Sequence, residues 1–288
     1  MISEFKAREI SSAQEFLRLS EALRTAEPIS TQIIGGAASG IVRGTTNYDR
    51  CTWWVVELGE VVVGIAMHTE PFNLFLSPMP SGASLTLANL IINEHPDFPG
   101  VNGPSEVVKP FLQQCVEHSK KSMHYKLRQE HLAYLIEEVT PPEDIIGEIR
   151  LATKKDRDLA LQWYVAFAVE AGVDNHNLES VVDRAIGDER LYLWTVNGEV
   201  VSLAGHTAAL DISSGALPRI GPVYTPPENR KRGYASFLVA EICGRLLERG
   251  FSVMLYADAA NPDSNNVYIK IGFRLVGSNS IWGTTWGE

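Results

Sequence analysis

The sequence predicts an α/β protein made of two similar units, and three observations support this. Residues 221–256 read as a strand, a polar loop, a helix and a second strand, the order of a parallel strand pair with a right-handed crossover. Residues 53–69 and 191–207 share one plan, in which two strands flank a Gly-Glu turn, so each stretch predicts a β-hairpin. The chain has 288 residues, which is long for one compact domain and sufficient for two.

The two hairpins indicate an internal repeat, because each follows a helical region and they lie about half a chain apart. Apolar residues at helical spacing predict helices in 13–24 before the first hairpin, and in 156–172 and 178–186 before the second. The proline-containing segment 141–144 predicts the boundary between the units. A chance likeness between two common hairpins is the alternative.

The helix after the second hairpin opens on a run of cations. Residues 230–235 read Arg-Lys-Arg-Gly-Tyr-Ala, and the apolar residues that follow fall on one helical face up to Gly250. Free N–H groups, the positive end of the helix dipole and cationic side chains meet at one point, which favours a bound phosphate. The spacing matches neither a P-loop nor a Rossmann turn. A basic first turn that only improves solubility is the alternative.

A second strand and a short helix come next. Residues 251–256 form an apolar run typical of a strand buried on both faces of a sheet. Asn261 and Pro262 then predict the start of a helix, and Gly272 predicts its end. The sequence thus places a polar helix start directly after a buried strand.

Two motifs resemble those of the GCN5-related N-acetyltransferase (GNAT) superfamily. Arg230-x-x-Gly233-x-Ala235 after a strand is similar to its acetyl-coenzyme A (acetyl-CoA) signature, and Asn-x-x-Tyr-x-x-x-Gly-Phe over 265–273 is similar to its downstream pattern. The resemblance implies an α/β (α+β) fold of two GNAT-like modules. Each is expected to have a mixed, mostly antiparallel twisted sheet flanked by helices, with a splayed parallel strand pair at the cofactor site.

The expected domains are 1–142, a degenerate copy without the CoA loop, and 145–288, the catalytic acetyltransferase domain. In the first copy, a helix predicted over 105–119 follows the segment 96–104, which has glycines but no Arg or Lys. Acidic residues at Asp97 and Glu106 would repel phosphate there. We expect this copy to keep the fold without the cofactor.

The resemblance also implies the site. The pantetheine arm of CoA would lie beside residues 223–225, and the pyrophosphate would bind the N–H groups of 232–236. Asn265 would hydrogen-bond the arm from the other side. The expected cofactor-binding residues are Val223, Tyr224, Thr225, Arg230, Lys231, Arg232, Gly233, Tyr234, Ala235, Ser236 and Asn265.

Tyr268 is the expected catalytic residue, since it matches the position of the family's general acid. Its reference pKa of about 10 exceeds the value of about 8.5 for a thiol, so we expect a hydrogen bond to the departing thiolate rather than full proton donation. A Tyr268 that only packs is the alternative. The general base is left open: His206 is a candidate, but His68 at the repeated position favours a structural role for both. The polar turn 174–177 either recognises the acceptor or only turns the chain.

Composition limits the partners. The net charge of −10 argues against nucleic acid or an anionic membrane as the main partner. The three cysteines are far apart, so we expect buried thiols, with no disulfide and no metal site. We expect a cytoplasmic protein, because no apolar stretch has the length of a membrane span and the N-terminal residues do not read as a signal peptide.

The resemblance implies direct transfer of the acetyl group from acetyl-CoA to a primary amine on a small molecule or peptide. A CoA-binding regulatory module without turnover and an aminoacyl transferase of the tandem GNAT-like type are the alternatives. The sequence leaves the acceptor and the oligomeric state open.

Overall fold

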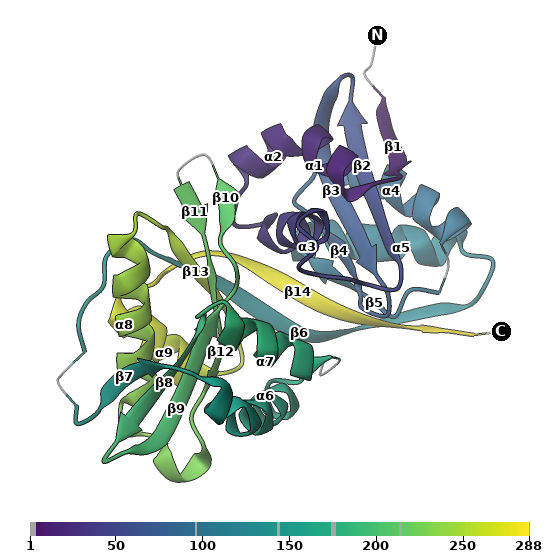
Figure 1. The fold of residues 1–288 in the computed structure, drawn as a ribbon. Helices are drawn as coiled ribbons and strands as arrows, with labels where there is room; N and C mark the ends of the chain where they lie inside the picture. Colours follow the sequence, from purple (N-terminus) through teal and green to yellow (C-terminus); the bar gives the residue numbers. More distant parts are fainter. Residues whose placement is uncertain (1–3, 96, 143–144, 174–176, 213–214, 288) are drawn as a thin grey trace. The chain divides into compact units, whose positions relative to one another are not determined.

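The chain forms two compact units, 1–132 with 277–288 and 133–276. The computed structural model describes residues 4–95, 97–142, 145–173, 177–212 and 215–287 (Figure 1). The chain leaves the first unit within strand β6 (Met123–Ile136) and returns to it within β14 (Arg274–Trp286). The bounds of these units differ from those of the expected domains, because two long strands each contribute residues to both units.

The first unit has one sheet with helices on both faces. Its elements are β1 (Phe5–Ile10), α1 (Ala13–Leu19), α2 (Glu21–Ala26), α3 (Gln32–Val42), β2 (Cys51–Leu58), β3 (Val61–Thr69), β4 (Leu74–Leu76), α4 (Ser81–Glu94), β5 (Gly100–Gly103) and α5 (Ser105–His118). The strands lie in the order β1, β2, β3, β4, β5 and β14. The first predicted hairpin is confirmed, since β2 pairs antiparallel with β3 and Trp53 lies opposite Met67.

Two adjacent tryptophans show how this sheet divides its core. Trp54 belongs to a buried cluster with Leu87 of α4 and Phe111 of α5. Trp53 belongs to a separate cluster with Phe16 of α1 and Ile34 of α3. Successive side chains of a strand point to opposite faces. The helices α4 and α5 therefore cover one face of the sheet, and α1 and α3 cover the other.

The second unit has the same general plan. Its elements are β7 (Glu148–Leu151), a 3-10 turn (Lys154–Asp156), α6 (Arg157–Ala171), α7 (Leu178–Gly187), β8 (Leu191–Val196), β9 (Glu199–His206), β10 (Leu210–Ile212), β11 (Gly215–Leu217), β12 (Arg219–Tyr224), a 3-10 turn (Pro227–Asn229), α8 (Tyr234–Glu248), β13 (Val253–Asp258) and α9 (Pro262–Ile271). The strands lie in the order β13, β12, β9, β8 and β7, antiparallel except for β12 and β13, which are parallel. The second predicted hairpin is confirmed, with Tyr192 opposite Ala204.

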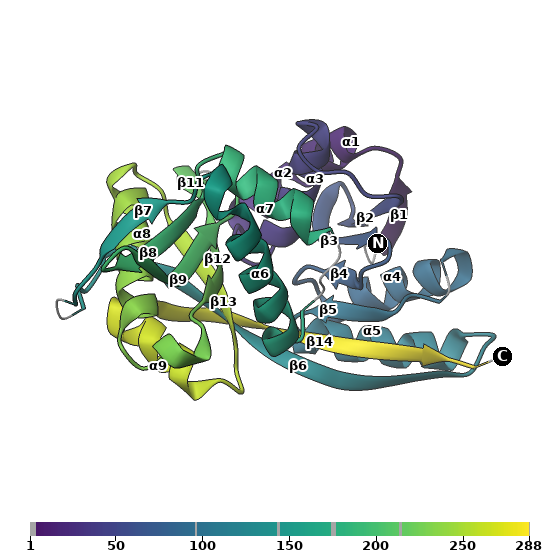
Figure 2. The same ribbon diagram turned by 60° about the horizontal axis from the view of Figure 1, so that its bottom comes forward.

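Helices cover both faces of this sheet as well (Figure 2). Leu193 and Leu203 pack in a buried cluster with Trp163 of α6. The next strand residue, Trp194, instead contacts Phe237 of α8, with the ring centroids 5.0 Å apart. Strand alternation thus places α8 on the face opposite α6. The predicted fold class, a mixed and mostly antiparallel sheet flanked by helices, is confirmed.

The two units share one order of elements. The series β2, β3, β4, α4, β5, α5 in the first matches β8, β9, β12, α8, β13, α9 in the second, with β10 and β11 as an addition. The counterpart of α8 is therefore α4, and the expectation that placed it at 105–119 is wrong. The sequence obscured α4 because small residues such as Ala83, Ser84 and Ala88 form much of its buried side, which weakens the apolar stripe.

All three cysteines are free thiols; Cys115 and Cys243 are buried, as expected, whereas Cys51 is only partly buried. Burial raises the pKa of Cys51 to about 11 and that of Cys115 to about 12. Burial also raises the pKa of Cys243, so all three stay protonated at neutral pH. Among the helices of the described ranges, none combines the length and the apolar character needed to cross a membrane.

Candidate cofactor and active site

The parallel strands β12 and β13 are paired over only two residue pairs and then separate. In the described structure their pairing consists of Arg219 with Met254 and Ile220 with Leu255, although both strands continue. On its other edge β12 stays paired with β9, with a register shift between Ile220 and Val223. Such a bulge bends a strand. Beyond Ile220, β12 has no partner strand on the edge that faces away from β9. The backbone N–H and C=O groups on this edge therefore need other hydrogen-bond partners.

The loop that follows β12 ends in an open helix N-terminus. Lys231 and Gly233 adopt left-handed backbone conformations, with φ of 61° and 80°, and α8 begins at the next residue. Gly233 is the N-cap and offers no side chain, and the first helical hydrogen bond joins the Phe237 N–H to the Gly233 oxygen at 3.0 Å. The N–H groups of residues 234–236 are thus free in the described structure. Free N–H groups at the positive end of a helix dipole attract anions.

The three basic residues of this loop, Arg230, Lys231 and Arg232, have different contacts. Lys231 and Arg232 are exposed and form no ion pair with any residue of the described ranges. Arg230 is committed to α6: its Nη2 atom donates to both carboxylate oxygens of Glu170, at 2.8 and 2.7 Å. Its Nε atom donates to the Thr225 oxygen at 2.9 Å. Arg230 therefore fixes the loop, and two cations remain available for an anion.

Asn265 on α9 is buried and already well hydrogen-bonded. Its Nδ2 atom donates to the backbone oxygens of Asp258 and Asn261, each at 2.8 Å. Its Oδ1 atom accepts from the Tyr134 hydroxyl at 3.1 Å. The neighbouring Asn261 is exposed and caps α9 through its oxygen, which accepts from the Ser264 N–H at 3.1 Å. The Asn261 side-chain N–H groups have no partner among the described residues, and the sequence analysis missed this residue as a candidate contact.

Tyr268 lies one turn further along α9, between the rings of Tyr134 and Phe273, with centroids 6.5 and 5.8 Å away. Part of the residue is exposed, and its hydroxyl forms no hydrogen bond within the described structure. Burial, with a smaller effect of the nearby Cys243, raises the pKa of Tyr268 to about 12. The hydroxyl therefore keeps its proton at neutral pH and is suited to donate a hydrogen bond rather than to act as a base.

His206, the candidate base, lies on the α8 side of the sheet. Its ring stacks on Tyr192, which points away from the α6 side, where Leu191 and Leu193 are buried. Its Nδ1 atom is 2.9 Å from the Thr207 oxygen, and burial lowers the pKa of His206. These contacts describe a neutral histidine held by its own strand end.

His68 repeats this behaviour in the first unit. Its Nε2 atom is 3.0 Å from the Phe72 oxygen, and burial lowers its pKa too. The like contacts of the two histidines favour the structural reading for both. Of the polar turn at 174–177, residues 174–176 lie outside the described residues.

The counterpart loop of the first unit, residues 77–80, contains no Arg or Lys. A Cβ atom added to Gly82 in the first turn of α4 would lie 2.6 Å from the Phe5 ring, so the ring closes on this turn. A Cβ added to Gly103 of β5 would lie 2.7 Å from the Leu76 oxygen of β4. The helix N-terminus of α4 also lacks a side-chain cap, but in the described residues its loop carries no cation and the Phe5 ring packs against its first turn.

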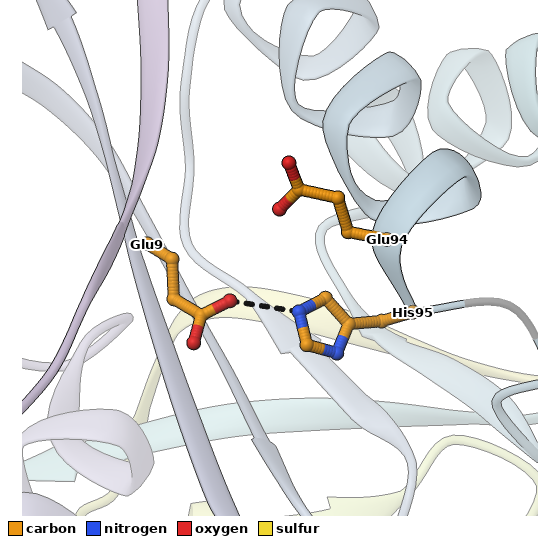
Figure 3. Close-up of side chains that lie close together, drawn as sticks. All are labelled: Glu9, Glu94 and His95. Atoms are coloured by element: carbon orange, nitrogen blue, oxygen red, sulfur yellow. Dashed lines mark hydrogen bonds and ion pairs between the residues drawn. The ribbon is translucent and has the colours of Figure 1, made fainter.

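One group in the described residues has the composition of a metal site: Glu9, Glu94 and His95, in the first unit (Figure 3). The Oε2 atom of Glu9 is 2.7 Å from Nε2 of His95. Both glutamates are exposed, as is common for acidic groups that bind no ion. We assign the contact to a hydrogen-bonded pair between β1 and the end of α4. The expectation that the chain has no metal site stays a prediction.

The comparisons with known proteins concern the fold and one region of the sequence. Residues 194–283 match the family model described as FR47-like protein, a range that contains β12, the basic loop, α8, β13 and α9. No match was found among curated protein sequences.

Solved structures share the fold along nearly the whole chain. A GCN5-related N-acetyltransferase from Sphaerobacter thermophilus is 15% identical, with a TM-score of 0.63 over 98% of this chain and 95% of its own. A GNAT-family acetyltransferase from Colwellia psychrerythraea is 14% identical, with a TM-score of 0.59 over 98% and 100%. A Drosophila protein is 11% identical, with a TM-score of 0.66 over 97% and 98%. The chain therefore has the GNAT fold and carries an FR47-like region in its second unit, which confirms the resemblance predicted from the sequence.

Proposed function

We propose that the second unit is an N-acetyltransferase that moves the acetyl group of acetyl-CoA to a primary amine on a small molecule or peptide. One observation carries the proposal: β12 separates from β13 ahead of an uncapped helix N-terminus with two cations that form no ion pair among the described residues. An extended arm with amide groups needs the first feature, and a pyrophosphate needs the second. The likeness in fold to structures described as N-acetyltransferases is in keeping with this use.

The cofactor contacts follow from the free groups of the site. The amides of pantetheine would pair with backbone groups of residues 223–225 on the edge that faces away from β9, where the Tyr224 and Thr225 oxygens already accept one hydrogen bond each, from Ser202 and Arg230. The pyrophosphate would bind the N–H groups of 234–236. Lys231 and Arg232 would add charge-assisted hydrogen bonds. In this proposal Arg230 and Asn265 hold the loop and the start of α9, and the free side-chain N–H groups of Asn261 contact the arm.

The chemistry needs two proton transfers. The acceptor amine attacks the thioester carbonyl and loses a proton, while the C–S bond breaks and leaves a thiolate that gains one. Moving the proton of Tyr268, with its pKa of about 12, to a thiolate with a reference value near 8.5 would cost on the order of 5 kcal/mol. Tyr268 is therefore proposed to hydrogen-bond the developing thiolate, and solvent carries the proton from amine to thiol.

Calorimetric titration of the full chain with CoA tests the cofactor site. We expect the variant K231A/R232A to bind CoA at least about tenfold more weakly at low salt, because two charge-assisted contacts are lost. The matched control K120A/K126A removes two exposed lysines of the first unit and should bind like the wild type. Absence of binding to the wild type at millimolar CoA would exclude the proposal.

Turnover separates a transferase from a CoA-binding module without chemistry. Free thiol released from acetyl-CoA is measured with a panel of primary amines, including small molecules and peptide N-termini. Release that depends on an amine supports the transferase. Tight binding of CoA with no release across the panel points to the regulatory module instead.

A further inference from the structure

The segment 133–140 lies along α9 from its first turns to its end. At one end the Tyr134 hydroxyl donates to Oδ1 of Asn265 at 3.1 Å. At the other end the Thr140 N–H donates to the Ile271 oxygen at 2.7 Å. The approach is close, since a Cβ added to Gly272 would lie 2.6 Å from the oxygen of residue 138. This segment therefore fixes α9 at both ends, although it precedes the linker that the sequence suggested as the domain boundary.

Asn265 is the centre of the hydrogen bonds at the start of α9. Its two side-chain N–H groups reach the oxygens of Asp258, at the end of β13, and of Asn261, at the helix cap. An amide rotated by half a turn would direct its oxygen at these two oxygens and its N–H groups at Tyr134. The two backbone oxygens can only accept, so they select this orientation, and the Tyr134 hydroxyl completes it by donating to Oδ1. Both side chains are at least nine-tenths buried, so each lost hydrogen bond leaves an unsatisfied polar group.

Tyr268 follows Asn265 by three residues, which places both side chains on neighbouring positions of one helix face. The ring of Tyr134 also contacts the ring of Tyr268, with the centroids 6.5 Å apart. A rotation of α9 about its axis would therefore move the Tyr268 hydroxyl. Groups that act on a reacting atom must be held to within about 0.5 Å by their surroundings.

We infer that Tyr134 is a positioning residue for Tyr268, acting through Asn265, and that segment 133–140 is part of the functional unit. The inference rests on the proposed function of Tyr268. It has a consequence for the domain bounds: a fragment that starts near residue 145 lacks Tyr134, whose hydroxyl satisfies Oδ1 of Asn265 and whose ring packs beside Tyr268. Such a fragment would bind CoA through the loop and α8 but would hold Tyr268 poorly.

The test compares Tyr134→Phe with the wild type in the full chain. The variant keeps the ring and removes the hydroxyl, so we expect kcat to fall about tenfold while KM for acetyl-CoA and CoA affinity stay within about twofold. Asn265→Asp should show the same selective loss of kcat, because a carboxylate cannot donate to the two backbone oxygens. The control Glu137→Gln changes another residue of segment 133–140. It removes an exposed ion pair between Glu137 and Arg274 and should leave kcat unchanged.

A spectroscopic measurement keeps this inference separate from the proposed function. The ring carbon resonance of Tyr268, labelled at Cζ and assigned by its loss in Tyr268→Phe, should shift in Tyr134→Phe and remain unshifted in Glu137→Gln. No turnover by the wild type with any amine would reject the proposed function. Turnover with an unchanged kcat and an unchanged Tyr268 resonance in Tyr134→Phe would reject the positioning role. If Tyr134→Phe does not fold, Asn265→Asp is measured in the same way.

Discussion

The loops that lead into α4 and into α8 occupy the same place in the order of elements, and neither helix has a side-chain cap, but the loops differ in charge and in what packs against the first helical turn. Within the part of the chain that the structure describes, the loop before α8 carries Lys231 and Arg232 without ion pairs and leaves three helix N–H groups without a partner. The loop before α4 has no Arg or Lys, and the Phe5 ring closes against its first helical turn. A repeated fold thus keeps its layers while one copy alone keeps the features of a site, because folds position sites without determining them.

The strand pairs that flank these loops also differ: β4 and β5 lie close together at their ends, whereas β12 and β13 separate. In the first unit β4 and β5 also form two residue pairs, but the next residue, Gly103, still lies close to the Leu76 oxygen of β4. In the second unit a register shift after Ile220 turns β12 away from β13. Backbone groups that lose their strand partner are costly unless a ligand or water satisfies them. The comparison therefore predicts that only the second unit responds to CoA.

Substitution of the glycine in each loop should give the largest contrast. Gly233→Val forces a β-branched residue into a backbone with φ of 80°, so we expect the helix N-terminus to shift and the CoA-dependent rise in Tm to disappear. Gly82→Ala introduces a clash with Phe5 and should cost about 1–3 kcal/mol of unfolding free energy, with CoA affinity unchanged. Thermal shift and calorimetry measure both effects. A loss of CoA binding in Gly82→Ala would contradict the prediction that only the second unit binds CoA.

Removing the Tyr268 hydroxyl should affect turnover and spare binding. We expect Tyr268→Phe to lower kcat about 100-fold, the lower range for a positioned proton-transfer or hydrogen-bonding group, with CoA affinity within about twofold. The helix α5, the counterpart of α9 in the first unit, contains no tyrosine. Steady-state kinetics with the best amine from the panel measures this effect. Equal kcat in the Phe variant removes Tyr268 from the mechanism.

The parts of the site that depend on local sequence could be predicted, and those that depend on distant contacts could not. Gly233 and the cations beside it act through their own backbone and charge, so the pattern alone indicated an anion site. Arg230 looked like its neighbours, yet its partner Glu170 lies 60 residues earlier in the chain. No local pattern reveals such a pair, because the fold alone brings α6 to the loop.

The two asparagines illustrate the same limit. The sequence favoured Asn265 as a cofactor contact, whereas the structure commits it to Asp258, Asn261 and Tyr134. Tyr134 is 131 residues away in sequence. An amide side chain can donate and accept in either orientation, so its residue type does not show which of its hydrogen bonds the fold has already used. The missed helix α4 is a related case, since its small buried residues became meaningful only against a sheet.

The raised pKa of Tyr268 predicts a loss of stability in alkali. The folded value of about 12 lies above the unfolded value near 10, so the neutral hydroxyl stabilises the fold below pH 10 and this contribution is lost as the pH rises to 12. The wild type should lose more stability than Tyr268→Phe over this range, by about 1.4 kcal/mol at pH 11 and up to about 2.7 kcal/mol at pH 12 and above. Urea unfolding of both proteins at pH 9, 10 and 11 measures the difference. Parallel curves for the two proteins would argue against a buried hydroxyl.

The smallest effect is expected at Glu170. Glu170→Gln weakens the bond to Arg230 and removes one negative charge from the surroundings of the loop, so CoA should bind about two- to threefold more tightly at low salt. The stability should change by less than about 1 kcal/mol, because both side chains of the pair are roughly half exposed. The gain should fade in 0.5 M salt, where the screening length is well below that at low salt. Weaker binding of CoA to this variant at both salt concentrations would instead mean that the ion pair holds the loop in the conformation that binds the cofactor. The contrast between the two units would then rest on loop geometry more than on charge.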